Sequence, residues 1–154
     1  MTNVTTYQKN LIESLAANEE SLSRLYHLYS NQFNQFADFW QQISQEELEH
    51  GKWIKNLLNL VNEDKILFEE GRFSKWAIDN YAESVKARIT SAETRRLNLK
   101  EEAQFSLSLE ESMIENKFFE VFQGDLPELI QVLLALEVST NSHIERLKKF
   151  LIQI

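Results

Sequence analysis

The fold is decided by residues 35–61, QFADFWQQISQEELEHGKWIKNLLNLV. Apolar side chains recur there every three or four residues, which is the spacing of one buried face of an α-helix. Glu47 and His50 interrupt that face, one helical turn apart. Because a buried carboxylate without a partner is costly, a glutamate on a core-facing stripe needs a hydrogen-bonding partner or a metal ion.

The same periodicity predicts four long helices, at about 6–31, 35–61, 99–123 and 126–151. Local chemistry marks three of their starts: capping-box patterns begin at Thr5 and Asn98, and Asp125 stands shortly before a proline. A further helical segment, at about 74–95, occupies the connection between the second and third long helices. We expect the acidic pair Glu101–Glu102 to lie on a solvated face in the first turn of the third helix.

Connection lengths predict the topology. Short connections join the first helix to the second and the third to the fourth, so each pair should form an antiparallel hairpin. The helical segment between the hairpins would span roughly 33 Å at about 1.5 Å per residue. That length would carry the chain along the bundle, so that the third helix starts at the same end as the second. We therefore expect an all-α bundle of two hairpins with one long crossover, forming a single domain over residues 1–154.

Composition supports this class and excludes several others. The 154 residues include three glycines and one proline, where average usage would give roughly eighteen, so turn-rich β folds are disfavoured. The chain has no cysteine, which excludes disulfides, iron–sulfur clusters, thiolate zinc sites and a rubredoxin-type iron centre. The net charge of −8 argues against nucleic acid or an anionic membrane as partner. Without a signal-like start or a long apolar run, we expect a cytoplasmic protein.

Each of the other three long helices also has a polar residue on its apolar stripe. Glu19 interrupts the stripe of the first helix, and Glu110 or Glu111 fills the gap in the third, with Glu110 nearer the centre of the face. The stripe of the fourth helix contains Glu137 and Thr140, and His143 lies on its adjoining edge.

These polar positions also agree in depth along the helices. Residues equidistant from the turn of an antiparallel hairpin come level with one another. Glu19 and Glu47 are symmetric about the first turn, and Glu110 and Thr140 are symmetric about the second. All four helices would therefore present their polar residues in one layer if the two turns lie at the same end of the bundle.

This pattern resembles the ferritin-like superfamily, and specifically a rubrerythrin-like protein that lacks the rubredoxin domain. In that family a Glu from each of two helices and a Glu-x-x-His from each of the other two bind two irons. By position, Glu19 and Glu110 resemble terminal or bridging carboxylates, Glu47 with His50 resembles the first Glu-x-x-His, and His143 resembles the second histidine. The resembling segments are residues 18–26, 39–50, 109–115 and 140–143.

The fourth helix departs from the family pattern. Thr140 stands where the second Glu-x-x-His should have its carboxylate. In the alternative register Glu137 is the carboxylate, and Thr140 then replaces the histidine. We predict that His143 is the main ligand from this helix, because positions 140 and 143 match Glu47 and His50 in depth.

The resemblance implies a carboxylate/histidine metal-binding protein with two iron ions, although Mn or Zn would also suit these ligands. Its chemistry would be that of an oxidoreductase acting on O2 or peroxide, supplied by an external electron donor, or simple iron binding. The alternative is a metal-free helical bundle with a structural or protein-interaction role. The thirteen Phe and Trp residues are compatible with a homodimer.

Overall fold

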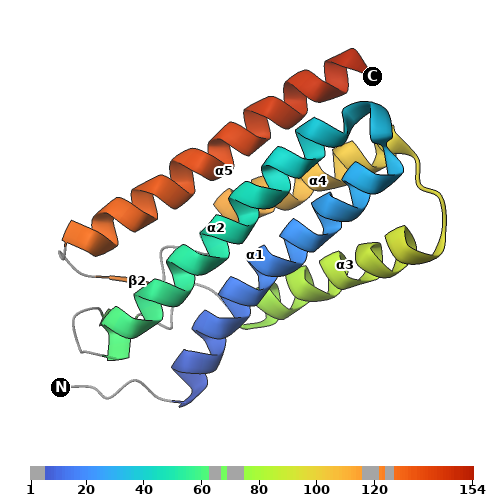
Figure 1. Cartoon of the computed structure of the whole chain (residues 1–154). Helices are drawn as coiled ribbons and strands as arrows, with labels where there is room; N and C mark the ends of the chain where they lie inside the picture. Colours follow the sequence, from blue (N-terminus) through green and yellow to red (C-terminus); the bar gives the residue numbers. More distant parts are fainter. Residues whose placement is uncertain (1–5, 63–66, 69–74, 116–121, 124–126) are drawn as a thin grey trace.

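The computed structural model describes residues 6–62, 67–68, 75–115, 122–123 and 127–154 (Figure 1). The described part is a helical bundle, as predicted, and each predicted helix has a counterpart in it. The elements are α1 (Thr6–Gln32), the short 3₁₀ helix η1 (Asn34–Phe36), α2 (Ala37–Asn62), β1 (Leu67–Phe68), α3 (Lys75–Thr94), α4 (Leu99–Glu115), β2 (Phe122–Gln123) and α5 (Pro127–Gln153).

The start of α4 follows the predicted capping chemistry. The side-chain oxygen Oδ1 of Asn98 accepts a hydrogen bond from the backbone N–H of Glu101 at 3.0 Å, which satisfies a donor that a helix start would otherwise leave unpaired. Pro127 is the first residue of α5, where its lack of an N–H is harmless. The caps predicted at Thr5 and Asp125 lie outside the described residues.

The prediction of one helix over residues 99–123 is wrong at its C-terminal end. α4 is described as far as Glu115, whereas Phe122 and Gln123 form β2 and pair antiparallel with Phe68 and Leu67. Aromatic and β-branched residues before a glycine suit a strand as well as a helix, so apolar spacing alone could not distinguish the two. The resulting two-stranded ribbon pairs Leu67–Phe68, between α2 and α3, with Phe122–Gln123, between α4 and α5.

The helices form two antiparallel pairs, α1 with α2 and α4 with α5, and α3 packs along α1 (Figure 1). α1 ends and α2 begins at one end of the bundle, whereas α4 ends and α5 begins at the opposite end (Figure 1). The condition that both turns share one end is therefore wrong. The polar residues nevertheless form one layer, because Glu19, Glu47 and Thr140 lie close to the middle of 26- or 27-residue helices. A residue at the middle of a helix is at almost the same depth in the bundle whichever way the helix runs.

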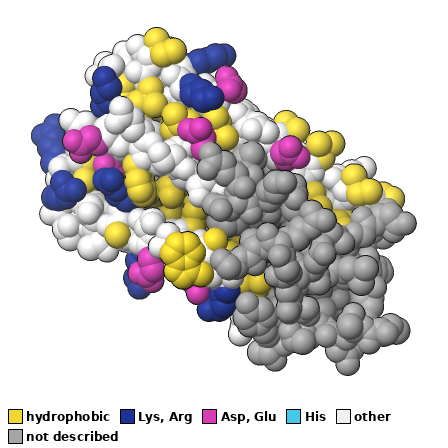
Figure 2. All heavy atoms as spheres, turned by 180° about the vertical axis from the view of Figure 1, so that it is seen from behind, with side chains coloured by type: hydrophobic (Ala, Val, Ile, Leu, Met, Phe, Trp, Pro, Cys, Tyr) yellow, Lys and Arg dark blue, Asp and Glu magenta, His cyan; other side chains and the backbone are white. Residues whose placement is uncertain are grey.

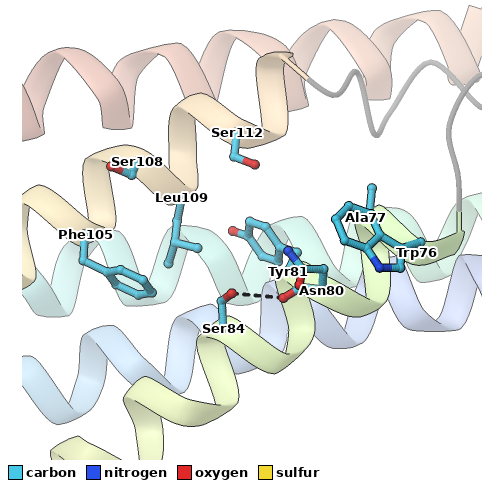
Figure 3. A pocket seen from close by; sticks show the side chains of 9 residues that line it. All are labelled: Trp76, Ala77, Asn80, Tyr81, Ser84, Phe105, Ser108, Leu109 and Ser112. Carbon is cyan, nitrogen blue, oxygen red and sulfur yellow. Dashed lines mark hydrogen bonds between the residues drawn. The ribbon is translucent and has the colours of Figure 1, made fainter.

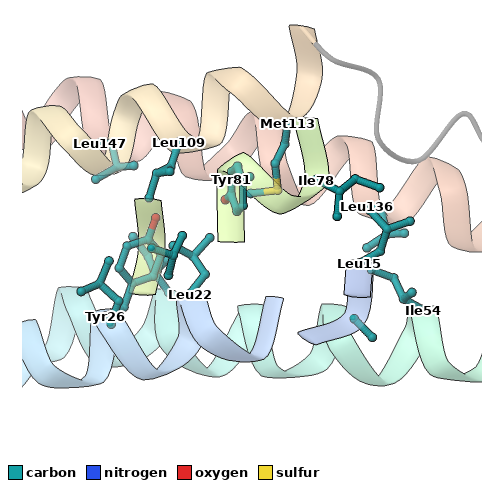
Figure 4. Packing of buried hydrophobic residues seen from close by; sticks show 14 of the residues in the cluster. Leu15, Leu22, Tyr26, Ile54, Ile78, Tyr81, Leu109, Met113, Leu136 and Leu147 are labelled. Carbon is teal, nitrogen blue, oxygen red and sulfur yellow. The ribbon is translucent and has the colours of Figure 1, made fainter. Parts of the chain in front are cut away.

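Side chains from all five helices build the core (Figure 4). Tyr26, Tyr29 and Trp40 are fully buried, and Trp40 packs against both tyrosine rings at 5.6 and 4.9 Å between centroids. At the end of the bundle where α2 begins, the Phe39 ring stacks on Phe150 of α5 at 4.2 Å. Aromatic packing of this kind fixes how α1, α2 and α5 meet.

The prediction that Glu102 lies on a solvated face is also wrong, because this residue is fully buried. Its carboxylate accepts a hydrogen bond from the Tyr29 hydroxyl at 2.7 Å and pairs with Arg88 of α3 at 2.8 Å. The sequence around Glu102 gave no sign that α3 would bring an arginine to this turn. The contacts of Glu102 with Tyr29 and Arg88 therefore connect α1, α3 and α4.

The described surface mixes charges of both signs. On the face seen in Figure 2, Lys and Arg side chains lie among Asp and Glu side chains and do not form a patch of one sign. α5 exposes Ile130, Leu134 and Val138 at a spacing of four residues, which gives it an outward apolar stripe; the homodimer stays a prediction. Among the described helices, none combines the length and the apolar character needed to cross a membrane.

Candidate metal centre

Two groups of metal-ligand side chains meet in the interior of the bundle. One consists of Glu19, Glu47 and His50, and the other of Glu47, Glu110 and His143. Within each group the three ligand atoms all lie within 4.8 Å of one another. Because Glu47 belongs to both, the two groups form one continuous cluster of five side chains, none of which is more than 3% exposed.

Four different helices supply this cluster. Glu19 comes from α1, Glu47 and His50 from α2, Glu110 from α4, and His143 from α5. The structure thus brings together five of the six residues that the sequence singled out as ligand candidates.

The alternatives for α4 and α5 are also resolved by position. Glu110 is fully buried whereas Glu111 is half-buried, so Glu110 is the α4 carboxylate that faces the cluster. Glu137 is exposed and lies outside the cluster. Three residues rotate an α-helix by about 300°, so Glu137 lies about 60° round the helix from Thr140, on the side that faces solvent. Thr140 is fully buried in the layer, at the depth where the family pattern has a carboxylate.

Both histidines point the Nδ1 atom inward. His50 Nδ1 lies 3.0 Å from Oε2 of Glu47, and His143 Nδ1 lies 2.9 Å from Oε1 of the same carboxylate and 3.3 Å from Oε1 of Glu110. The two imidazole rings stack at 5.4 Å between centroids. Glu47 is therefore bracketed by one imidazole on each of its oxygens.

The outer Nε2 atom of each histidine has its own partner. His50 Nε2 lies 2.7 Å from the Ser139 hydroxyl, and His143 Nε2 lies 3.2 Å from Oε2 of Glu46. Glu46 is held in turn by Arg146 at 2.6 Å. Histidines that ligate metals commonly have such an outer partner, which fixes the ring and its tautomer.

Sequence reasoning missed Glu46 and Ser139 as members of the site. A weak signal existed for Glu46, because His143 and Arg146 are three residues apart on one helix and can face the same carboxylate. Tyr26 packs in the core, and its hydroxyl also donates a hydrogen bond to Oε1 of Glu110 at 2.9 Å.

Electrostatics in this cluster favour one ionised carboxylate, Glu47. Burial would raise its pKa, but hydrogen bonds from His143 and His50 outweigh burial and hold the pKa well below the ordinary value. Burial raises the pKa of Glu19 well above its ordinary value, and the neighbouring Glu47 charge adds to the rise.

The second group holds further protons. Burial, followed by the charge of Glu47, raises the pKa of Glu110 to about 8. Burial lowers the pKa of His143, but hydrogen bonds with Glu110 and Glu47 more than offset this and raise it to about 10. Without metal, the cluster therefore balances its charge with protons.

Each of the two groups offers ligand atoms that could hold a metal ion. Within the described part of the chain, Oε2 of Glu19, Oε2 of Glu110 and Oγ1 of Thr140 are buried and have no hydrogen-bond partner. Unpaired buried oxygens are uncommon in native proteins and call for an explanation such as a bound ion or water. Carboxylate oxygen with imidazole nitrogen is a ligand set suited to Fe, Mn or Zn.

Comparison of the chain with protein-family models, with curated proteins and with solved structures gives no match in any of the three. The interpretation of the cluster therefore depends on its own geometry and chemistry.

Proposed function

We propose that this chain is a ferritin-like, rubrerythrin-like metal-binding protein that holds two ions, with iron as the first candidate. The observation that carries the proposal is the sharing of Glu47 between two buried ligand groups. A carboxylate with an imidazole against each oxygen is suited to bridge two ions. Four helices contributing to one buried layer also agree with the two-hairpin topology of the ferritin-like bundle.

Each ion would have one group of side chains. Glu19 and His50 would hold the first, Glu110 and His143 the second, and Glu47 both. When bound, a pair of iron ions supplies one-electron redox chemistry toward O2 or peroxide. Mn or Zn would fit the same donors, and an oxidoreductase would need an external electron donor.

The protein's own contribution is to exclude water and to fix the ligands. All five side chains are buried, so their electrostatic interactions are stronger than in water. Glu46 and Ser139 hold the outer nitrogens of the two histidines, which keeps both Nδ1 atoms directed inward. The Tyr26 hydroxyl donates a hydrogen bond to Glu110 and so orients that carboxylate.

Metal stoichiometry tests the proposal. The purified chain, loaded anaerobically with Fe²⁺ and freed of excess metal, should retain about two ions per chain by elemental analysis. Glu19→Gln and Glu110→Gln should each reduce this to about one ion, because each removes a ligand of a single group. Glu47→Gln should lose both, and Glu137→Gln is the matched control that should retain both.

The alternative is a metal-free bundle, and one contact favours it. His143 lies between Glu46 and Glu47, so a protonated imidazole can balance these carboxylates without any metal. Retention of fewer than about one tenth of an ion per chain, by a folded protein, would overturn the metal-binding proposal and leave this alternative. If metal is retained, the oxidoreductase role is tested by adding O2 or peroxide to the Fe²⁺-loaded chain and monitoring oxidation of the iron by absorbance. Glu47→Gln serves as the comparison.

A further inference from the structure

A cavity of about 230 Å³ lies between α3 and α4 (Figure 3). Three aromatic side chains contribute to its lining: Trp76 and Tyr81 from α3 and Phe105 from α4. Smaller polar side chains, including Ser84 and Ser108, complete it. The cavity is a candidate ligand site that the metal centre does not use.

One end of the cavity is held together by Arg88. Its guanidinium lies 4.2 Å above the centre of the Phe105 ring and pairs with buried Glu102. This arginine therefore fixes both the spacing of α3 and α4 and the orientation of the Phe105 ring. Trp76, nearer the start of α3, is 72% exposed and borders the cavity on its open side.

Two polar groups in the lining, the Ser84 and Ser108 hydroxyls, can accept a hydrogen bond from a ligand. The Ser84 hydroxyl donates its proton to the backbone oxygen of Asn80 at 3.0 Å, and the Ser108 hydroxyl donates to that of Gln104 at 3.1 Å. Each hydroxyl oxygen keeps acceptor capacity after donating its proton. A ligand that donates a hydrogen bond therefore fits these two positions.

Charge disfavours ionic ligands. None of the nine side chains lining the cavity carries a formal charge at neutral pH, and Arg88 at its end is already paired with Glu102. An ionic ligand would lose hydration without gaining an opposite charge, which is unfavourable. The lining thus favours an uncharged molecule.

The inner wall of this cavity borders the metal-ligand cluster. Tyr81 and Leu109 are buried side chains of that wall, and Leu109 is followed directly by Glu110. The charge of Glu110 also contributes, after burial, to a pKa for Tyr81 well above its ordinary value. Tyr81 therefore contributes to the cavity wall and also lies near the carboxylates of the cluster.

We infer that the cavity between α3 and α4 binds a small uncharged phenol, with its ring among Trp76, Tyr81 and Phe105 and its hydroxyl donating to Ser84 or Ser108. Apolar cavities of about 150 Å³ hold benzene, so this one has room for a substituted ring. The inference goes beyond the proposed function, and phenol binding does not require bound metal.

The test measures binding of 4-fluorophenol to the metal-free chain by ¹⁹F NMR. We expect 4-fluorophenol to bind saturably, and at least about tenfold more tightly than 4-fluoroanisole, which lacks the hydroxyl proton. We expect 4-fluorobenzoate not to bind. Ser108→Phe should abolish binding by filling the cavity, whereas Ser142→Phe, an exposed serine on α5, should leave it unchanged.

A second variant keeps the test decisive if Ser108→Phe does not fold. Trp76→Ala removes an exposed ring and should weaken 4-fluorophenol binding by about tenfold. Equal binding of the phenol and the benzoate, unchanged binding by Trp76→Ala, or no saturable binding to the native chain would each overturn the inference. Metal content measured on the same preparations tests the proposed function separately.

Discussion

Loading the two ligand groups with metal should release protons, and the structure sets the number. At pH 7, His143 is protonated on both ring nitrogens, because its pKa is raised to about 10, and it can release one proton from Nδ1. Glu110, with a pKa raised to about 8, holds about 0.9 of a proton. Both must be lost before Nδ1 and the carboxylate can bind metal. We therefore expect about two protons per chain, rising toward three because the pKa of Glu19 is also raised.

The sign of the pH dependence follows from this competition. Protons and metal ions bind the same atoms, so overall metal affinity falls as the pH falls. Between pH 7 and pH 6, with at least about two protons bound throughout, the product of the two metal-binding constants should fall by about 100-fold or more.

Calorimetric titration with redox-inactive Zn²⁺ measures the proton number. Titrations at pH 7 in buffers of different ionisation enthalpy give the protons released as the slope of the observed heat. Glu110→Gln should lower the slope by about two protons, because it removes its own proton and also the second ion, which displaces the proton of His143. Exposed Glu137→Gln should not change the slope. Release of less than about half a proton by the metal-binding native chain would refute the charge assignment derived from the contacts of His143 and Glu110.

Three further predictions concern other parts of the molecule. At Gly51 an added Cβ would lie 3.2 Å from Cγ of Glu20 and 3.4 Å from the backbone oxygen of Ala16. Gly51→Leu should therefore push α1 away from α2 and lower the free energy of unfolding, measured in urea, by about 1–3 kcal/mol. An unchanged free energy of unfolding would contradict the close approach of α1 and α2 at this glycine. Tyr29→Phe removes the 2.7 Å hydrogen bond to buried Glu102 and should lower the same quantity by about 1.5–3 kcal/mol, whereas His27→Gln, at an exposed neighbouring position, should cost little. Thr140→Glu should destabilise the metal-free chain and tighten binding of the second ion in a competitive metal titration, with Ser142→Glu as the exposed control. Weaker metal binding by Thr140→Glu would show that position 140 does not face the ions.

The helices and the buried polar layer were predictable because both depend on regular spacing. Helical periodicity placed Glu19, Glu47 and His50 on core-facing stripes, and their mid-helix positions made their depth insensitive to the direction of each connection. That is why the layer is correct although the assumed common end of the two turns is wrong. His143, rather than Glu137, faces the cluster, in agreement with the same depth arithmetic.

The remaining features depend on contacts between elements far apart in the sequence. Arg88 reaches Glu102 because α3 packs along α1 beside the start of α4, and no local pattern around Glu102 encodes that neighbour. Glu46 enters the site through His143 and Arg146 of α5, about one hundred residues later in the chain. The strand at Phe122–Gln123 exists because it pairs with Leu67–Phe68, and that pairing has no helical period to reveal it.

Thr140 limits the charge that the centre can balance. Glu19, Glu47 and Glu110 bring at most three negative charges, whereas two divalent ions bring four positive ones. A carboxylate in place of Thr140 would complete the balance. The next carboxylate, Glu46, acts only through the outer nitrogen of His143 and is itself paired with Arg146 at 2.6 Å. Because a trivalent pair would be balanced still less than a divalent pair, this ligand set favours the lower oxidation state. If iron occupies the two proposed groups, we expect them to bind the ferrous ions more tightly than the oxidised ions.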